Sequence, residues 1–198
     1  MTKDIKASTT ARDVVTDGTI DDITIRKIRS DSVTSLSKQI YDWLKQQDPK
    51  DYADFHLTFV DAKDYQDFAV KITHLVQSQD IALNDGRVPT TYYLIRKSGQ
   101  IIGLAKTRLL LNGQTAHEGG HIRLAIEPAY REQGFGGFVL DYLMSELKSH
   151  GVKDIMFSTY ADNYAARRLI QATGGFEESL GESWNDPTKT VIRYWIHF

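Results

Sequence analysis

The chain has 198 residues, of which 41% are hydrophobic and 25% are charged, and its formal net charge is −2. These values are ordinary for one globular domain that can bury a sizeable core. The chain has no cysteine, which excludes a disulfide framework, a thiolate nucleophile and a cysteine-ligated metal site. A charge this near zero gives no reason to expect nucleic-acid or membrane partners.

The start of the chain differs in composition from the rest. Residues 1–19 are polar and lack hydrophobic periodicity, so we expect a tail followed by one domain at 20–198. The stretch after Met1 has no apolar segment typical of a signal peptide, and no apolar run approaches the length that spans a bilayer. We therefore expect a cytoplasmic protein.

Hydrophobic patterns of period 2 and period 3.6 follow one another along the chain and predict a mixed α/β sheet. The predicted strands lie at 23–28, 90–96, 101–110, 121–127, around 155–157, at 176–184 and at 190–197. The predicted helices lie at about 32–45, at 61–79, from the loop after 127 to about 150, and at 162–174. Residues 50–60 fit a loop as well as a strand.

Local signals mark the ends of several elements. The candidate helix caps are Asp31 or Ser32, Asp61 and Asp162. The turn signals are Asn84-Asp85-Gly86, Ser98-Gly99 and Asn112-Gly113. Of these, Asn112-Gly113 follows a strand pattern directly and predicts a two-residue hairpin turn.

The most informative stretch is the strand, loop and helix between 121 and 150. Pro128 ends the strand because it cannot donate to a ladder. The following segment, Arg131 to Gly137, holds three glycines, which permit positive φ and close approach of a ligand to the backbone. Unpaired N–H groups and the helix dipole favour an anion at such a helix start. A glycine-rich turn that binds nothing is the alternative.

The loop contains neither the dinucleotide pattern G-x-G-x-x-G nor the Lys-Ser/Thr of a Walker loop. It reads Arg131-x-x-Gly134-x-Gly136, which resembles the acetyl-coenzyme A loop, Q/R-x-x-G-x-G/A, of the GNAT superfamily of N-acetyltransferases. Further on, Asn163-x-x-Ala166-x-x-Leu169 and then Gly175-Phe176 resemble the second cofactor motif of that family.

The resemblance covers about residues 22–198. It implies a GNAT fold, which is a mixed, mostly antiparallel twisted sheet of about seven strands flanked by about four helices. A narrower likeness is to a group of predicted bacterial acetyltransferases with a G-G-H-I…R-Y-W-I pattern. In this chain the two parts of the pattern are Gly119-Gly120-His121-Ile122 and Arg193-Tyr194-Trp195-Ile196.

The resemblance also implies acetyl-CoA as co-substrate and no metal. The residues expected to hold it are Leu124, Ala125 and Ile126 in the fourth strand, Arg131, Gln133, Gly134, Phe135, Gly136 and Gly137 in the loop, and Asn163, Ala166 and Arg167 in the last helix. The strand would pair with the pantetheine arm, and the loop amides would hold the pyrophosphate. Arg131 would shape the loop or contact phosphate. Asn163 could instead be a helix cap, and Arg167 could simply be solvated.

Acetyl transfer to an amine needs a group that takes the amine proton and one that returns a proton to the thiolate. His121 and Glu118, beside the fourth strand, are the candidate bases, and a histidine titrates near neutrality. A structural hydrogen bond is the alternative role for His121. In the family a tyrosine seven residues after the asparagine serves as acid, but that position is Ile170 here. Tyr164 or Tyr160 could take its place.

These observations predict an N-acetyltransferase that moves an acetyl group from acetyl-CoA to a primary amine by direct attack on the thioester. The acceptor could be a small-molecule amine, a lysine side chain or an N-terminus. The alternative is a catalytically weak sensor or scaffold that binds acyl-CoA with the same fold, and Ile170 keeps this alternative open. A homodimer is compatible with either function.

Overall fold

The structure is a computed structural model that describes residues 22–52, 55, 62–77 and 88–198. Within these ranges the strands are β1 Ile23–Lys27, β2 Thr91–Lys97, β3 Gln100–Thr107, β4 Ile122–Ile126, β5 Asp154–Tyr160, β6 Phe176–Glu182 and β7 Thr190–His197. The helices are α1 Val33–Leu44, α2 Pro49–Tyr52, α3 Tyr65–Gln77, α4 Gly113–His117, α5 Phe135–Ser149 and α6 Tyr164–Ala172. The predicted tail at 1–19 lies outside the described residues.

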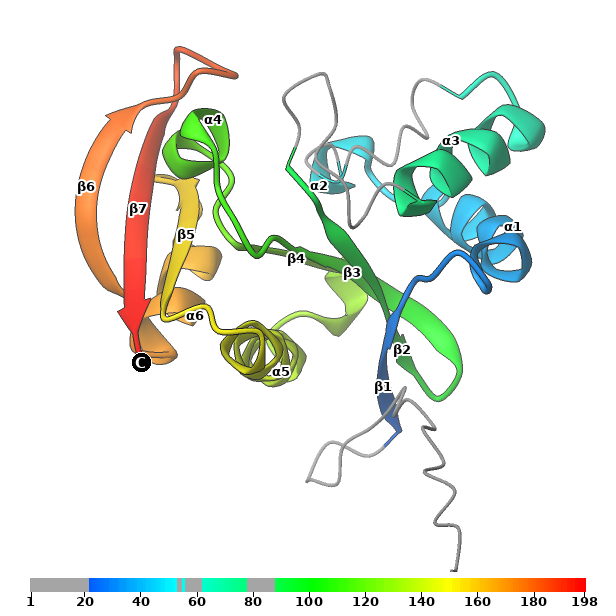
Figure 1. Ribbon diagram of the computed structural model, residues 1–198, viewed down its shortest axis with the longest axis horizontal. Coiled ribbons are helices and arrows are strands. Elements are labelled where there is room, and N and C mark those ends of the chain that lie inside the picture. Colours follow the sequence, from blue (N-terminus) through cyan, green and yellow to red (C-terminus); the bar gives the residue numbers. More distant parts are fainter. Residues whose placement is uncertain (1–21, 53–54, 56–61, 78–87) are drawn as a thin grey trace, which may run out of the picture.

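The strands form two antiparallel sheets, β1-β2-β3-β4 and β5-β7-β6 (Figure 1). The sheets meet where β4 begins, because His121 N–H donates to Met156 O at 2.8 Å. Two residues on, Arg123 Nη1 donates to Ser158 O at 3.0 Å, so β4 and β5 run in the same direction. Gly120 makes this junction possible. Its φ is +70°, and a Cβ there would lie 2.5 Å from Met156 O.

The first sheet is covered on both faces. Tyr93 and Ile95 of β2 pack into a core cluster with α5, while Tyr92 and Leu94 pack into a second cluster with α1 and α3. Figure 1 shows α5 on one side of this sheet and α1 and α3 on the other. A strand buried on both faces reads as a continuous apolar run instead of an alternating one. Both tyrosines are therefore core residues.

The hairpin turn predicted at Asn112-Gly113 is wrong. Asn112 instead caps α4: its Oδ1 accepts the Thr115 N–H at 2.9 Å, and Thr115 Oγ1 accepts the Asn112 N–H at 2.9 Å. This reciprocal capping box starts a helix where a two-residue turn was expected. The β3–β4 connection is closed further on, where Arg108 Nη1 donates to Gly120 O at 2.8 Å. As a result β3 ends at Thr107, three residues before the predicted end.

The helix boundaries also differ from the prediction. Asn163, and not Asp162, caps α6, because its Oδ1 accepts the Ala166 N–H at 3.1 Å. Asp64 accepts the Asp67 N–H at 2.9 Å at the start of α3. The predicted cap Asp61 and the predicted turn Asn84-Asp85-Gly86 lie outside the described residues. Among the helices that the structure does describe, none is both long and apolar enough to span a bilayer.

Candidate active site

Beyond their junction, β4 and β5 belong to different sheets, and a cleft of about 270 Å³ lies between them. Its walls come from both strands, from α5 and α6, and from the segment around α2. The lining residues are Lys50, Asp51, Phe55, Glu118, Ile122, Arg123, Leu124, Leu140, Phe157, Ser158, Thr159, Tyr160, Asn163, Ala166, Leu169, Ile170 and Val191.

One wall of the cleft is a strand edge. Arg108 N–H donates to His121 O at 2.9 Å, and Glu127 N–H donates to Ile102 O at 2.8 Å, so the odd-numbered residues of β4 face β3. Alternate residues of an antiparallel strand direct their backbone groups to opposite sides. The backbone groups of Ile122, Leu124 and Ile126 therefore face away from β3, along the cleft. Such an edge can pair with an extended ligand.

The glycine loop adjoins the cleft at the start of α5. Gly134 is the N-cap of this helix at φ +84°, and the first helical bond runs from Phe138 N–H to Gly134 O at 3.2 Å. The N–H groups of Phe135, Gly136 and Gly137 precede that bond and have no acceptor within the helix. Together with the helix dipole they form an anion-binding position.

Side-chain size sets the shape of this loop. A Cβ at Gly136 would lie 3.3 Å from Leu169, a residue of the cleft wall, and the Phe135 side chain is buried. Larger residues at Gly136 would push α6 away from α5. The glycine loop therefore packs against Leu169, which also lines the cleft.

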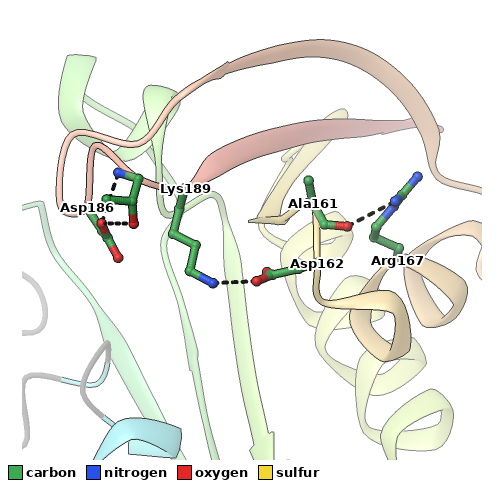
Figure 2. A network of polar contacts seen from close by, with 6 residues as sticks. Ala161, Asp162, Arg167, Asp186 and Lys189 are labelled. Atoms are coloured by element: carbon green, nitrogen blue, oxygen red, sulfur yellow. Dashed lines mark hydrogen bonds and ion pairs between the residues drawn. The ribbon is translucent and has the colours of Figure 1, made fainter.

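The two arginines predicted to meet phosphate are held by the protein itself. Arg131 donates to Ile126 O at 2.8 Å and to the Asp51 carboxylate at 2.5 Å. This geometry fits the predicted role of shaping the loop. Arg167 donates to Tyr194 Oη at 3.1 Å. It also donates to Ala161 O at 3.0 Å, as Figure 2 shows. Its phosphate contact stays a prediction that these partners do not favour.

The remaining predicted cofactor residues divide between the cleft and the core. Leu124, Asn163 and Ala166 line the cleft, although Asn163 Oδ1 also serves as the helix cap. Ala125 and Ile126 pack into the core clusters, so only the backbone of Ile126 faces the cleft. The exposed Gln133 donates to Ala129 O at 2.8 Å.

Glu118 and Tyr160 come together on the cleft wall. Glu118 is 7% exposed and accepts hydrogen bonds from Ser183 Oγ at 3.0 and 2.9 Å and from Trp184 N–H at 3.1 Å. Burial alone would raise the pKa of Glu118, but hydrogen bonds from Ser183, Asn185 and Tyr160 outweigh it and hold the pKa below its ordinary value. The carboxylate is therefore ionised at neutral pH.

The other two candidate catalytic residues lie off the cleft wall. His121 is 7% exposed, and its Nδ1 accepts the Met156 N–H at 2.9 Å. Burial lowers the pKa of His121, and a proton on Nδ1 would break this bond. Tyr164 is 66% exposed, with the Arg167 guanidinium 5.8 Å above its ring. The catalytic roles of both residues stay predictions.

Several residues that line the cleft could not be predicted as site residues from the sequence. Lys50, Asp51 and Phe55 come from the α2 segment, where the pattern did not separate loop from strand. Arg123 reaches the cleft from β4 and Ser158 from β5. Nothing in the local sequence marks these residues, because only the docking of α2 and β5 beside β4 brings them to one surface.

The profile of the Acetyltransferase (GNAT) family matches residues 37–176, and the chain therefore belongs to this family. A curated relative is the ribosomal protein bS18-alanine N-acetyltransferase of Escherichia coli strain K12, which is 26% identical over 96 residues. That match covers 48% of this chain and 62% of the relative, so the chain spans less than two thirds of the relative's length.

Solved structures share the fold. A microcin C7 self immunity acetyltransferase in complex with acetyl-CoA and AMP matches with a TM-score of 0.65 and 14% identity, covering 90% of this chain and 93% of that one. A ribosomal L7/L12 alpha-N-protein acetyltransferase in complex with coenzyme A matches with a TM-score of 0.60 and 14% identity, covering 90% and 95%. The predicted GNAT fold is confirmed, with two short helices, α2 and α4, beyond the four expected.

Proposed function

We propose that this chain transfers an acetyl group from acetyl-CoA to a primary amine in the cleft between β4 and β5. The observation that carries the proposal is the cleft itself. Two parallel strands joined at Gly120 separate beside an amide-rich helix start, and the ionised Glu118 lies on the same wall. Both solved relatives described above hold coenzyme A or its acetyl ester, which supports the same ligand here.

The residues of the cleft fit this co-substrate. The amides of Phe135, Gly136 and Gly137 would hold its pyrophosphate, because they precede the first helical bond of α5. The edge of β4 at Ile122 and Leu124 would pair with the amide groups of the pantetheine arm. The described residues contain no group of side chains that could hold a metal ion, and the proposal needs none.

The thioester supplies an acyl carbon for a neutral amine. The C–N bond forms as the C–S bond breaks, the nitrogen gives up one proton, and the thiolate takes one. The lowered pKa of Glu118 makes this carboxylate a weak proton acceptor. We therefore assign it the attraction of the cationic acceptor, while the proton leaves to solvent in the open cleft.

Tyr160 is the tyrosine of the cleft wall, and we assign it the delivery of a proton to the thiolate in place of the absent tyrosine at Ile170. A thiol with a pKa near the roughly 8.5 of free cysteine needs only modest help near neutral pH. Losing Tyr160 should therefore cost less activity than losing the charge of Glu118.

The test is acetyl-CoA turnover with a panel of small amines and alanyl peptides, followed by thiol release and by mass spectrometry of the products. We expect thiol release that depends on the amine, with an acetylated product. Tight binding of acetyl-CoA without amine-dependent release would instead support the rival function, a sensor or scaffold that binds acyl-CoA.

The chemical class of the acceptor is also part of what we propose. The relative named above acetylates an N-terminal alanine by its name, which favours a peptide N-terminus among the candidate acceptors, with a lysine side chain and a small amine as alternatives. The membership in the G-G-H-I…R-Y-W-I group, the cytoplasmic location and a homodimer stay predictions.

A further inference from the structure

Trp184 presents an indole to solvent in a fixed orientation. The residue lies in the β6–β7 loop, is 62% exposed, and stacks on His117 with ring centroids 3.8 Å apart and an angle of 6° between the planes. The imidazole covers one face of the indole. An exposure this high therefore means that the other face is open.

The imidazole of His117, on which the indole stacks, has a hydrogen-bond partner at each of its two nitrogens. Arg193 Nη1 lies 3.2 Å from His117 Nδ1, and Glu182 O lies 2.8 Å from His117 Nε2. Arg193 can only donate and a carbonyl can only accept. His117 therefore accepts at Nδ1 and donates from Nε2, which fixes both its tautomer and the plane on which Trp184 rests.

The backbone of the loop is anchored to the cleft wall. Glu118 accepts the Trp184 N–H at 3.1 Å and the hydroxyl of Ser183, which is 1% exposed. At the far end of the loop, Lys189 forms an ion pair with Asp162 beside α6 (Figure 2). Because Glu118 also lines the cleft, the backbone that carries the indole is bound directly to a residue of the cleft wall.

The β6–β7 loop, which carries the indole, lies among more acidic than basic side chains. Four carboxylates lie on or beside the loop, against the cations Lys189 and Arg193; the carboxylates are Glu118, Asp162, Glu182 and Asp186. Hydrogen bonds from Thr188 hold the pKa of Asp186 below its ordinary value. The face of an indole is also the negative part of its quadrupole. The negative charge and the indole face together favour the binding of a cation and disfavour the binding of an anion.

We propose that the open face of Trp184 is a subsite for a second cationic group of the acceptor, bound while the reactive amine enters the cleft. The proposal rests on the proposed function, because it assumes that the cleft takes an amine acceptor. Two sources carry the required chemistry, a small amine with a second positive charge and a peptide with a basic side chain near its N-terminus.

The test compares acceptors that differ only in charge. The small-molecule pair is (4-aminobutyl)trimethylammonium and its neutral isostere 5,5-dimethylhexylamine. The peptide pair is an alanyl peptide with arginine or with norleucine at its second position. For each pair the measured quantity is the ratio of kcat/KM for the cationic acceptor to kcat/KM for the neutral one.

In the wild type we expect a ratio above one for at least one pair, and that pair identifies the source. In Trp184→Ala the ratio should fall about three- to tenfold, the range of cation–π contacts at partly exposed sites. Trp184→Phe should retain part of it. Phe198→Ala, which removes another exposed aromatic ring, should leave the ratio unchanged. The KM for acetyl-CoA should be the same in all variants.

Unchanged ratios in Trp184→Ala for both pairs would overturn the subsite. If the wild type shows no amine-dependent thiol release, the proposed function fails separately. The same pairs are then titrated calorimetrically into the protein with coenzyme A present. A preference for the cation that disappears in Trp184→Ala still supports the subsite, and equal binding of cation and isostere overturns it.

Discussion

Glu118 is the residue that connects the cleft with the β6–β7 loop. Glu118 lines the cleft, and its carboxylate also accepts hydrogen bonds from the hydroxyl of Ser183 and the N–H of Trp184. Hydrogen bonds to a charged group contribute about 1.5–3 kcal/mol each. Removing the charge should therefore weaken both the attraction for a cationic acceptor and the anchoring of the loop.

We expect Glu118→Gln to lower kcat/KM for the amine about 10- to 100-fold, a loss of about 1.4–2.8 kcal/mol in transition-state stabilisation. The KM for acetyl-CoA should change little, because the glycine loop is untouched. The matched control is Asp141→Asn, which removes one negative charge from an exposed residue of α5. Tyr160→Phe should cost less than tenfold. A wild-type kcat/KM for Glu118→Gln would remove Glu118 from the mechanism.

The burial of His121 should make the free energy of unfolding depend on pH. Because burial lowers the pKa of its imidazole below 6.5, the unfolded chain binds more protons than the folded one between the lowered value and about 6.5. The free energy of unfolding must then rise with pH through this interval. Stability is lost as the pH falls below about 6.5, since the folded ring resists the proton that the unfolded ring accepts.

We expect His121→Gln to flatten this dependence by up to about 1.4 kcal/mol per pH unit. The measurement is urea unfolding at several pH values between 5 and 7.5, with His150→Gln on the surface as the control. The activity of folded His121→Gln should stay within tenfold of wild type. A loss of 10²- to 10⁴-fold would instead identify His121 as the general base.

At the scale of single elements, the two ends of α5 offer a matched test of the anion site. Gly134 at the start has φ +84° and Gly151 after the end has φ +85°, and neither has an atom within 4 Å of a Cβ added there. An alanine at either position therefore adds similar backbone strain, roughly 1 kcal/mol. Of the two glycines, only Gly134 lies beside the amides that we propose hold the pyrophosphate.

We expect Gly134→Ala to weaken the binding of coenzyme A at least tenfold in calorimetry. Alanine disfavours the left-handed conformation at position 134, and the change in backbone conformation would turn the amides of Phe135, Gly136 and Gly137 away from the ligand. Gly151→Ala should bind coenzyme A like the wild type at a similar melting temperature. Equal affinities in the two variants would mean that the amides of α5 do not hold the pyrophosphate.

The elements show where prediction from sequence works. The glycine loop and the helix after it are local, and their positions followed from residue types. The cap of α6 was placed one residue early, at Asp162 instead of Asn163, because both residue types cap helices. The hairpin at Asn112-Gly113 failed because the side chain of Thr115 offered a capping box. The partners of Arg131 and Arg167 could not be predicted, because Asp51 and Tyr194 lie on other elements.

At the scale of the whole molecule, the site depends on contacts that sequence patterns do not report. Gly120 lets β4 approach β5 at one point, 36 residues before Met156 in the numbering of the chain. That contact sets the cleft and brings Tyr160 to Glu118. The family resemblance predicted the fold, and it also predicts the location of the cofactor loop. The wall formed by Lys50, Asp51 and Glu118 carries no motif of the family.

We propose that acetyl transfer takes place inside the cleft between β4 and β5. Neighbouring alanines of α6 test it directly, since Ala166 lines the cleft and Ala165 is exposed to solvent. The measurement is kcat/KM for acetyl-CoA with one amine for wild type, Ala165→Trp and Ala166→Trp, after circular dichroism has established that both variants fold.

An indole at Ala166 would fill much of the cleft, whereas the same indole at Ala165 would extend into solvent. We predict that Ala166→Trp lowers kcat/KM for acetyl-CoA at least about 100-fold, which is ~2.8 kcal/mol, and that Ala165→Trp stays within about twofold of wild type. A folded Ala166→Trp protein that turns over acetyl-CoA like the wild type would contradict the assignment of the reaction to this cleft.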